Sequence, residues 1–139
     1  MNAKAFIDTN IFIYLYSVDE EEKNHRASDA LEKYNCVIST QTLNEFSNFC
    51  IKKWKLEPAD ISLAITEMCT ACSLEYIDEG IVQQALQIHG RYGYAFYDCL
   101  MLASALASGC KYLFSEDMAD GQIINGTLEI VNILSRDVV

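Results

Sequence analysis

Short apolar runs alternate with longer amphipathic segments along this chain. Apolar runs that predict buried strands lie at 5–7, 36–39, 74–77, 111–114 and 129–133. Between them, apolar residues recur at helical spacing over 9–16, 19–34, 40–54, 58–72, 81–90 and 97–108. This alternation predicts an α/β fold, in which helices cover both faces of a central, mostly parallel sheet.

Polar residues stand where several of these helices would begin. Thr9 or Asn10 is suited to cap the first helix, and Thr40 or Thr42 is suited to cap the third. The chain has no linker rich in Pro, Gly or Ser, no repeat and no low-complexity segment. We therefore expect a single domain over residues 1–139, a length that can bury a substantial core.

The composition limits which classes of function this protein can have. No apolar run approaches the roughly 20 residues that a membrane-spanning helix needs, and the first residues lead directly into a strand rather than a signal peptide. We therefore expect a cytoplasmic protein with no membrane partner. The net charge of −10 argues against a broad basic face for nucleic acid. It does not exclude action on nucleic acid, because carboxylates loaded with divalent cations present a positive centre to phosphate.

Carboxylates stand at four points of this pattern. Asp8 follows the first strand, Glu45 lies early in the third helix, Asp98 begins the last helix, and Asp117 lies in an acidic turn after the fourth strand. In open α/β sheets, ligands bind at the carboxyl ends of the strands. The four positions together therefore predict a site, although no single one is specific.

Each acid also has a purely structural explanation. Asp8 could cap the helix that follows it, although Thr9 or Asn10 could take that role, and the Asn10 amide could then orient Asp8. Glu45 could be an acid placed favourably near a helix N-terminus. Asp98 is the sharpest candidate, because it precedes an apolar helix and needs a cation, hydrogen-bond donors or a helix N-terminus.

The acidic turn leaves a choice open. It holds Ser115, Glu116, Asp117 and Asp120, and the last two would face one side of a helical turn. A plain polar turn also explains this composition. The spacing alone does not decide which of the three acids points inward.

Converging carboxylates repel one another unless cations lie between them. Ligation by oxygen alone favours Mg²⁺ or Mn²⁺ over zinc. Such ions can make hydroxide from bound water and stabilise charge on a transferring phosphoryl group. His25 and His89 are expected at the surface, and the pair Cys69 and Cys72 has no second pair that would complete a zinc site.

In these motifs the chain resembles the PIN-domain nucleases, especially the VapC-like toxins of bacterial and archaeal toxin–antitoxin pairs. Asp8-Thr9-Asn10 matches their opening motif, and Glu45, Asp98 and Ser115-Glu116-Asp117-Met118 follow in the expected order. The resemblance covers essentially the whole chain, with the middle supported only by helix pattern and length.

The resemblance implies a three-layer α/β/α fold and a Mg²⁺- or Mn²⁺-dependent endoribonuclease that hydrolyses RNA. It makes Asp8, Glu45, Asp98 and Asp117 the metal-binding and catalytic set. It makes Ser115 their polar partner and Asp120 a possible extra acid. It also implies a small cognate antitoxin that blocks the site, and a homodimer.

Two other functions fit parts of the pattern. A receiver-like phosphoacceptor domain is also acidic, α/β and Mg²⁺-binding, but it usually carries an acidic pair after the first strand and a lysine after the last. Here only Asp8 follows the first strand, and no lysine follows residue 114. A PIN-like fold with an inactive site would serve only as a binding module.

The densest basic cluster lies late in the helix that carries Glu45. It consists of Lys52, Lys53 and Lys55. We expect these lysines to line a path for RNA. Favourable placement of cations at a helix C-terminus explains them equally well.

Overall fold

The computed structural model describes residues 2–138. In chain order, its elements are β1 (Lys4–Ile7), α1 (Thr9–Tyr16), α2 (Glu21–Lys33), β2 (Asn35–Ser39), α3 (Thr40–Lys52), α4 (Pro58–Ala71), β3 (Ser73–Glu75), α5 (Glu79–Tyr92), α6 (Phe96–Ala107), β4 (Tyr112–Phe114), β5 (Ile123–Ile124) and β6 (Leu128–Val131). The predicted alternation of strands and helices is confirmed.

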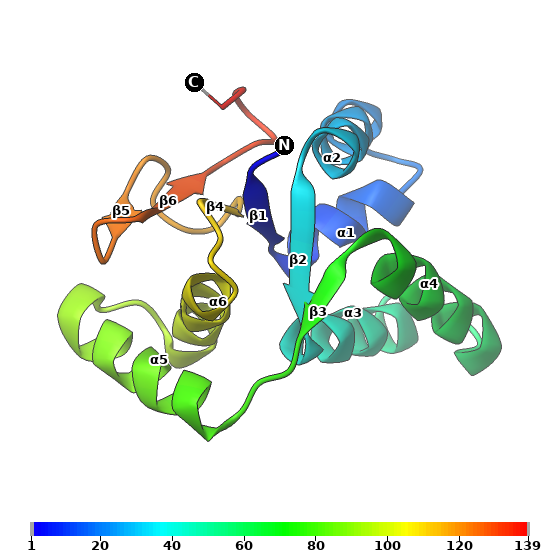
Figure 1. The fold of residues 1–139 in the computed structure, drawn as a ribbon. Coiled ribbons are helices and arrows are strands. Elements are labelled where there is room, and N and C mark those ends of the chain that lie inside the picture. Colours follow the sequence, from blue (N-terminus) through cyan, green and yellow to red (C-terminus); the bar gives the residue numbers. More distant parts are fainter. Residues whose placement is uncertain (1, 139) are drawn as a thin grey trace.

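The strands form one sheet in the order β3-β2-β1-β4-β6-β5 (Figure 1). All neighbouring pairs are parallel except β5 with β6. The chain runs outward from β1 through β2 to β3, and then returns to place β4 on the other side of β1. The switch point of this topology, where such sheets bind ligands, therefore lies between β1 and β4. Receiver domains have the order 2-1-3-4-5 instead, so the structure does not support that alternative.

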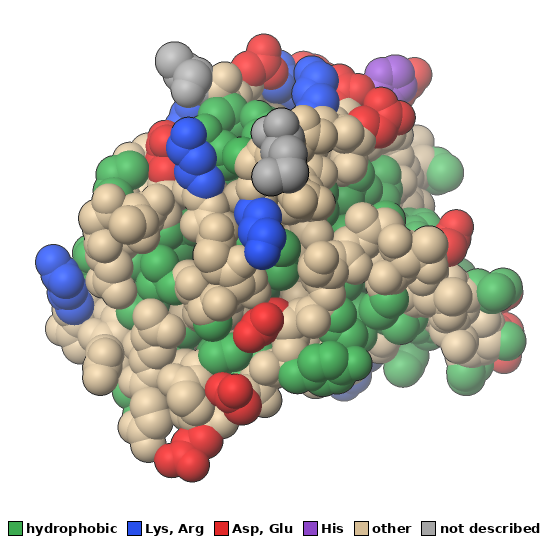
Figure 2. Space-filling model, in the orientation of Figure 1, with side chains coloured by type: hydrophobic (Ala, Val, Ile, Leu, Met, Phe, Trp, Pro, Cys, Tyr) green, Lys and Arg blue, Asp and Glu red, His purple; other side chains and the backbone are tan. Residues whose placement is uncertain are grey.

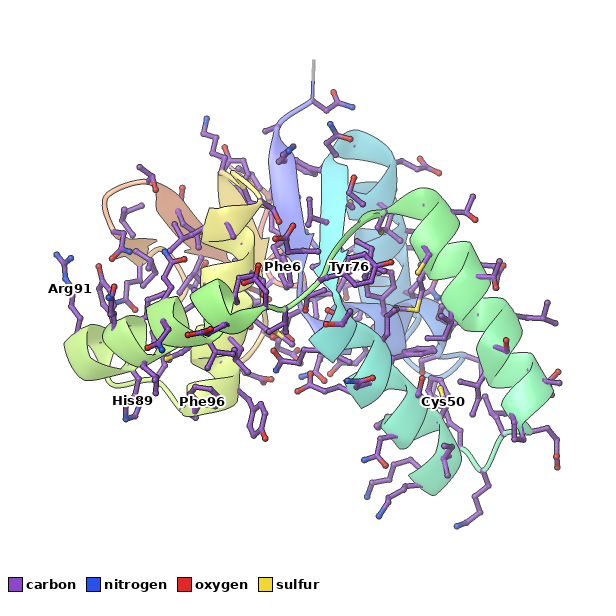
Figure 3. All side chains as sticks on the ribbon, turned by 60° about the horizontal axis from the view of Figure 1, so that its bottom comes forward. Phe6, Cys50, Tyr76, His89, Arg91 and Phe96 are labelled. Carbon is purple, nitrogen blue, oxygen red and sulfur yellow. The ribbon has the colours of Figure 1, made fainter. Side chains whose placement is uncertain are left out.

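Alternation along β1 divides the core between the two faces of the sheet. Ala5 and Ile7 join the cluster beneath α1 to α4, whereas Phe6 joins the cluster beneath α5 and α6. Figure 3 shows this division, with Phe6 on the α5–α6 side and Cys50 between α3 and α4. Three layers result, as expected, with the sheet in the middle.

One strand was not predicted from the sequence. Ile123–Ile124 forms β5, a two-residue strand that pairs antiparallel with β6. Asn125 and Gly126 make the turn between them, with φ of +50° and +76°. An Asn-Gly pair favours this kind of tight hairpin turn, so a signal was present, but two residues are too few to show a strand pattern.

One helix cap matches an alternative given above, and the other differs from expectation. Asp8 itself is the N-cap of α1, and Thr9 is the first helical residue. Ser39, not Thr40 or Thr42, is the N-cap of α3. Thr42 contributes differently, because its hydroxyl accepts the Ser39 backbone N–H at 3.2 Å. Asp8 directly follows β1 and Ser39 is the last residue of β2, so each of these parallel strands leads into its helix with no intervening loop.

The surface agrees with the acidic composition. Figure 2 shows Lys and Arg side chains scattered over the visible face, with no broad positive patch. Within residues 2–138, no helix is long and apolar enough to cross a membrane.

Candidate active site

The four predicted acids line one cavity of about 420 Å³ at the carboxyl ends of the strands. Asp8 and Asp117 follow β1 and β4 on the two sides of the switch point, Glu45 comes from α3, and Asp98 comes from α6. The remaining lining residues are Thr9, Asn10, Ile13, Asn48, Phe49, Lys52, Lys53 and Met101. Segments more than 100 residues apart in the sequence thus meet at one place.

Asp8 is held firmly at the bottom of this cavity. It is 7% exposed, and its carboxylate accepts the Thr9 backbone N–H at 2.6 Å and the Ser115 hydroxyl at 2.8 Å. Burial raises the pKa of Asp8 from 3.8 to about 6, and the charges of Glu45 and Asp117 add to the rise, against the two hydrogen bonds. Asp8 is both a helix cap and a carboxylate whose charge is costly in the cavity.

Glu45 lies in the second turn of α3 and is fixed by two donors. The Thr9 hydroxyl donates to Oε1 at 2.7 Å, and the Gln41 amide donates to Oε2 at 3.1 Å. The sequence analysis gave neither donor a role in the site. Gln41 lies four residues before Glu45, which is a contact spacing on a helix, whereas the contact from Thr9 depends on the tertiary fold.

Asp98 is the third residue of α6 and lies in its first turn. It is half-buried rather than fully buried, and among the described residues its carboxylate accepts no hydrogen bond. Burial raises the pKa of Asp98, and the charges of Asp117 and Glu45 raise it further. Of the three partners expected for this acid, the structure provides the helix N-terminus.

Asp117 is the acid of the last motif that faces the cavity. The Asn10 amide donates to it at 2.7 Å, and its own backbone N–H donates to the Ser115 hydroxyl at 3.2 Å. The idea that Asn10 orients Asp8 is therefore wrong, because Asn10 binds Asp117. Ser115 orients Asp8 instead, because its hydroxyl donates to that carboxylate. This agrees with the place beside the acids that the resemblance implied for Ser115.

The other two acids of this turn are paired with cations elsewhere. Glu116 contacts Lys23 at 2.7 Å and accepts the Tyr14 hydroxyl at 2.8 Å, and these bonds lower its pKa although burial raises it. Asp120 contacts Arg136 at 2.9 Å, and hydrogen bonding to that guanidinium lowers the pKa of Asp120. Neither side chain lines the cavity.

The basic cluster is divided by the end of α3. Lys52 is the last helical residue, Lys53 is the C-cap, and both line the cavity. Lys55, at a positive φ of 53°, is not among the lining residues. The two cavity lysines lie both at a helix C-terminus and beside the acids, so their position is compatible with either interpretation.

The chemistry of the lining fits a hard divalent cation. It offers carboxylate, amide and hydroxyl oxygens and neither thiol nor imidazole. Within residues 2–138, no basic side chain forms an ion pair with Asp8, Glu45, Asp98 or Asp117. No three acidic, His or Cys side chains of these residues already form a closed metal site. Asp8, Glu45 and Asp117 instead accept hydrogen bonds from neutral donors, which compensate part of their charge.

Fold and cavity together define a class: an α/β protein with a carboxylate cavity at the switch point of its sheet. The sequence matches the model of the PIN domain family over residues 5–119. The chain therefore belongs to the PIN-domain family, and the resemblance inferred from its motifs is confirmed. A comparison with curated proteins found no match.

Solved structures share this fold at low sequence identity. A toxin–antitoxin complex from Klebsiella pneumoniae aligns with a TM-score of 0.68 and 24% identity, covering 93% of this chain and 97% of that one. DNA-bound VapBC from Salmonella typhimurium aligns at 0.65 and 20%, covering 92% and 98%. A Mycobacterium tuberculosis VapC toxin that cleaves the Sarcin-Ricin loop aligns at 0.66 and 16%, covering 81% and 89%.

Proposed function

We propose that this protein is a Mg²⁺- or Mn²⁺-dependent endoribonuclease and the toxin of a toxin–antitoxin pair. The single observation that carries the proposal is the division of the acids. Within residues 2–138, Asp8, Glu45, Asp98 and Asp117 share one cavity and form no ion pair, while Glu116 and Asp120 form ion pairs outside it. Such a division is expected if the cavity takes its positive charge from bound cations.

The acids of the cavity are the residues that would hold the cation. A bound Mg²⁺ or Mn²⁺ supplies an activated water and neutralises charge on the phosphate under attack. Thr9 and Ser115 fix the Asp8 carboxylate, and Thr9 and Gln41 fix that of Glu45. Preorganised ligands of this kind reduce the cost of ordering the site when substrate binds.

Lys52 and Lys53 serve the substrate rather than the cation in this proposal. They line the same cavity as the acids and lie at the C-terminal end of α3. Their ammonium groups attract the phosphates that flank the scissile bond, in a protein whose net charge of −10 otherwise repels RNA. This function requires the protein to be in the cytoplasm, where its RNA substrate is found.

The test is cleavage of RNA by the purified protein with added Mg²⁺ or Mn²⁺. We expect Asp98→Asn to reduce the rate about 10²-fold or more, because the change keeps the size of the side chain but removes a charged ligand. Circular dichroism checks that the variant is folded. Wild type that binds RNA without cleaving it would favour the inactive binding module instead.

An apolar groove offers a place for the antitoxin. It has a volume of about 470 Å³ and lies between the end of α1, α3 and the start of α4. Val18 and Leu63 are 92% and 66% exposed there, and Asp19, Asp60 and Glu67 lie around them. We propose that an amphipathic antitoxin segment with Lys or Arg beside its apolar face binds this groove. The structural neighbours that are toxin–antitoxin complexes support a partner of this kind.

This surface can be tested apart from catalysis. Leu63→Glu should weaken binding of the small protein encoded by the neighbouring reading frame about tenfold or more, while free Leu63→Glu still cleaves RNA. Leu86→Glu is the matched control, since Leu86 is 51% exposed on α5, outside the groove. Sedimentation of the free protein tests the expected homodimer in the same experiment.

A further inference from the structure

A second cavity adjoins the active site and has no role in the mechanism above. Its volume is about 420 Å³, and it lies where α3 and α6 begin, beside the segment that joins β3 to α5. Its lining residues besides Glu45 are Thr40, Gln41, Asn44, Ile77, Tyr97 and Leu100. Glu45 lines both cavities, so a molecule in this side cavity lies next to the proposed cleavage site.

Gln41 lines the side cavity and contacts Glu45, which lines both cavities. Its amide nitrogen donates to Glu45 at 3.1 Å and to the Tyr97 carbonyl at 3.0 Å. Both contacts are acceptors, so the amide oxygen must point the other way. That oxygen is buried and has no hydrogen-bond partner among the described residues, in a side chain that is 7% exposed. The Gln41 amide nitrogen therefore holds the Glu45 carboxylate and the Tyr97 backbone in place where the two cavities meet.

Tyr97 places an aromatic ring at the rim of the side cavity. Its side chain is 66% exposed although it lies next to the catalytic Asp98. The Phe96 ring meets it edge-on, with 5.6 Å between the centroids, so the exposed ring has a supporting contact. Ile77 and Leu100 add apolar surface to the lining. An exposed ring above an apolar pocket is the arrangement on which proteins stack an unpaired base.

We propose that the side cavity holds one unpaired nucleobase of the RNA, beside the scissile phosphate, with Tyr97 as its stacking platform. The proposal rests on the endoribonuclease function and adds a base-binding subsite to it. A base can stack on this exposed ring only where it is unpaired in the RNA.

The test combines a change in the protein with a change in the RNA. An oligonucleotide that wild type cleaves at a mapped bond receives an abasic nucleotide at each position near that bond in turn. One position should lower kcat/KM about 5- to 150-fold, the range for loss of one stacked base. Tyr97→Ala should lower kcat/KM on intact RNA by a similar factor and add little further loss on the abasic RNA, because both changes remove the same contact.

The controls separate stacking from a general effect on the site. Tyr97→Ala keeps the backbone carbonyl that Gln41 binds, and Tyr97→Phe should retain nearly the wild-type rate because it keeps the ring. Tyr76→Ala is the matched control, because Tyr76 is 70% exposed on the segment between β3 and α5 (Figure 3) but does not line the side cavity. It should leave kcat/KM within about twofold, as a surface change.

Several results would overturn the proposal. If the losses from Tyr97→Ala and from every abasic position simply multiply, the ring and the bases act independently and no base subsite exists. If Tyr97→Ala also converts a dimer to a monomer in sedimentation, this face is an interface between two copies of the chain. If wild type cleaves no RNA with Mg²⁺ or Mn²⁺, the endoribonuclease function itself is wrong, and the subsite falls with it.

Discussion

The replacement Asp8→Asn tests the carboxylate cavity without any knowledge of the substrate. Asp8 is buried at the bottom of the cavity and accepts hydrogen bonds from Thr9 and Ser115. An asparagine of the same shape can accept the Thr9 N–H through its oxygen and donate to the Ser115 hydroxyl through its nitrogen. The change therefore removes the buried charge while leaving both contacts possible.

The pKa of Asp8 gives the magnitude. A rise from 3.8 to about 6 means that the ionised carboxylate costs the folded state up to about 3 kcal/mol, at about 1.4 kcal/mol for each pH unit. Asparagine does not bear this cost. We expect the metal-free variant to be more stable than metal-free wild type at pH 7. With about 3 to 4 °C per kcal/mol for a chain of this length, its melting temperature should rise by up to about 10 °C.

The pH dependence has a definite sign. Because the pKa of Asp8 is higher in the folded state, the folded protein binds a proton more tightly than the unfolded chain. This contribution to stability is fully present below pH 3.8 and is lost as the pH rises toward about 6. The advantage of Asp8→Asn should therefore be largest above pH 6 and shrink as the pH falls toward 4.

The assay is thermal melting of both proteins with and without Mg²⁺ or Mn²⁺, at matched ionic strength because salt alone screens the repulsion. At a metal concentration 100 times its dissociation constant, wild type should gain about 2.7 kcal/mol, and the variant should gain much less. Asp29→Asn, an exposed change on α2 outside the cavity, should show neither effect. The reasoning fails if metal-free Asp8→Asn melts below wild type at pH 7 yet keeps the full metal-induced shift, since Asp8 would then act only as a cap.

Two further predictions follow from the lining of the cavity. Asp117→Asn should reduce RNA cleavage about 10²-fold or more, whereas Asp120→Asn, the same change three residues later, should leave cleavage nearly intact, and equal losses would contradict the assignment. Changing Lys52 and Lys53 together to Gln should reduce the slope of log affinity against log salt concentration for single-stranded RNA by about 1.4, because about 0.7 counterions are released for each phosphate contact. Lys55→Gln should leave this slope unchanged. Filter binding over a range of KCl concentrations measures both variants.

The sequence predicted the elements that bury long apolar patterns and the edge of the sheet at which the acids gather. Asp8 and the turn at Ser115 could be placed because each follows an apolar strand, and the carboxyl ends of parallel strands share one edge. The two-residue strand β5 could not, because its pairing depends on β6 rather than on its own pattern.

The sequence also did not show which acid of the last turn faces the cavity. Asp117 faces inward because Lys23 holds Glu116 and Arg136 holds Asp120. Lys23 lies 93 residues from its partner, so only the folded chain brings this pair together. Local spacing treats all three acids alike, and tertiary ion pairs distinguish them.

The shortness of the two edge strands determines how other chains can attach to this one. The edges of the sheet are β3, with three residues, and β5, with two. Such short edges offer few free backbone groups for an added strand, which protects the sheet from edge-to-edge aggregation. A tightly bound partner is therefore expected to attach through side chains of the helices and loops rather than as an added strand. A designed inhibitor should accordingly be a helix rather than an extended peptide.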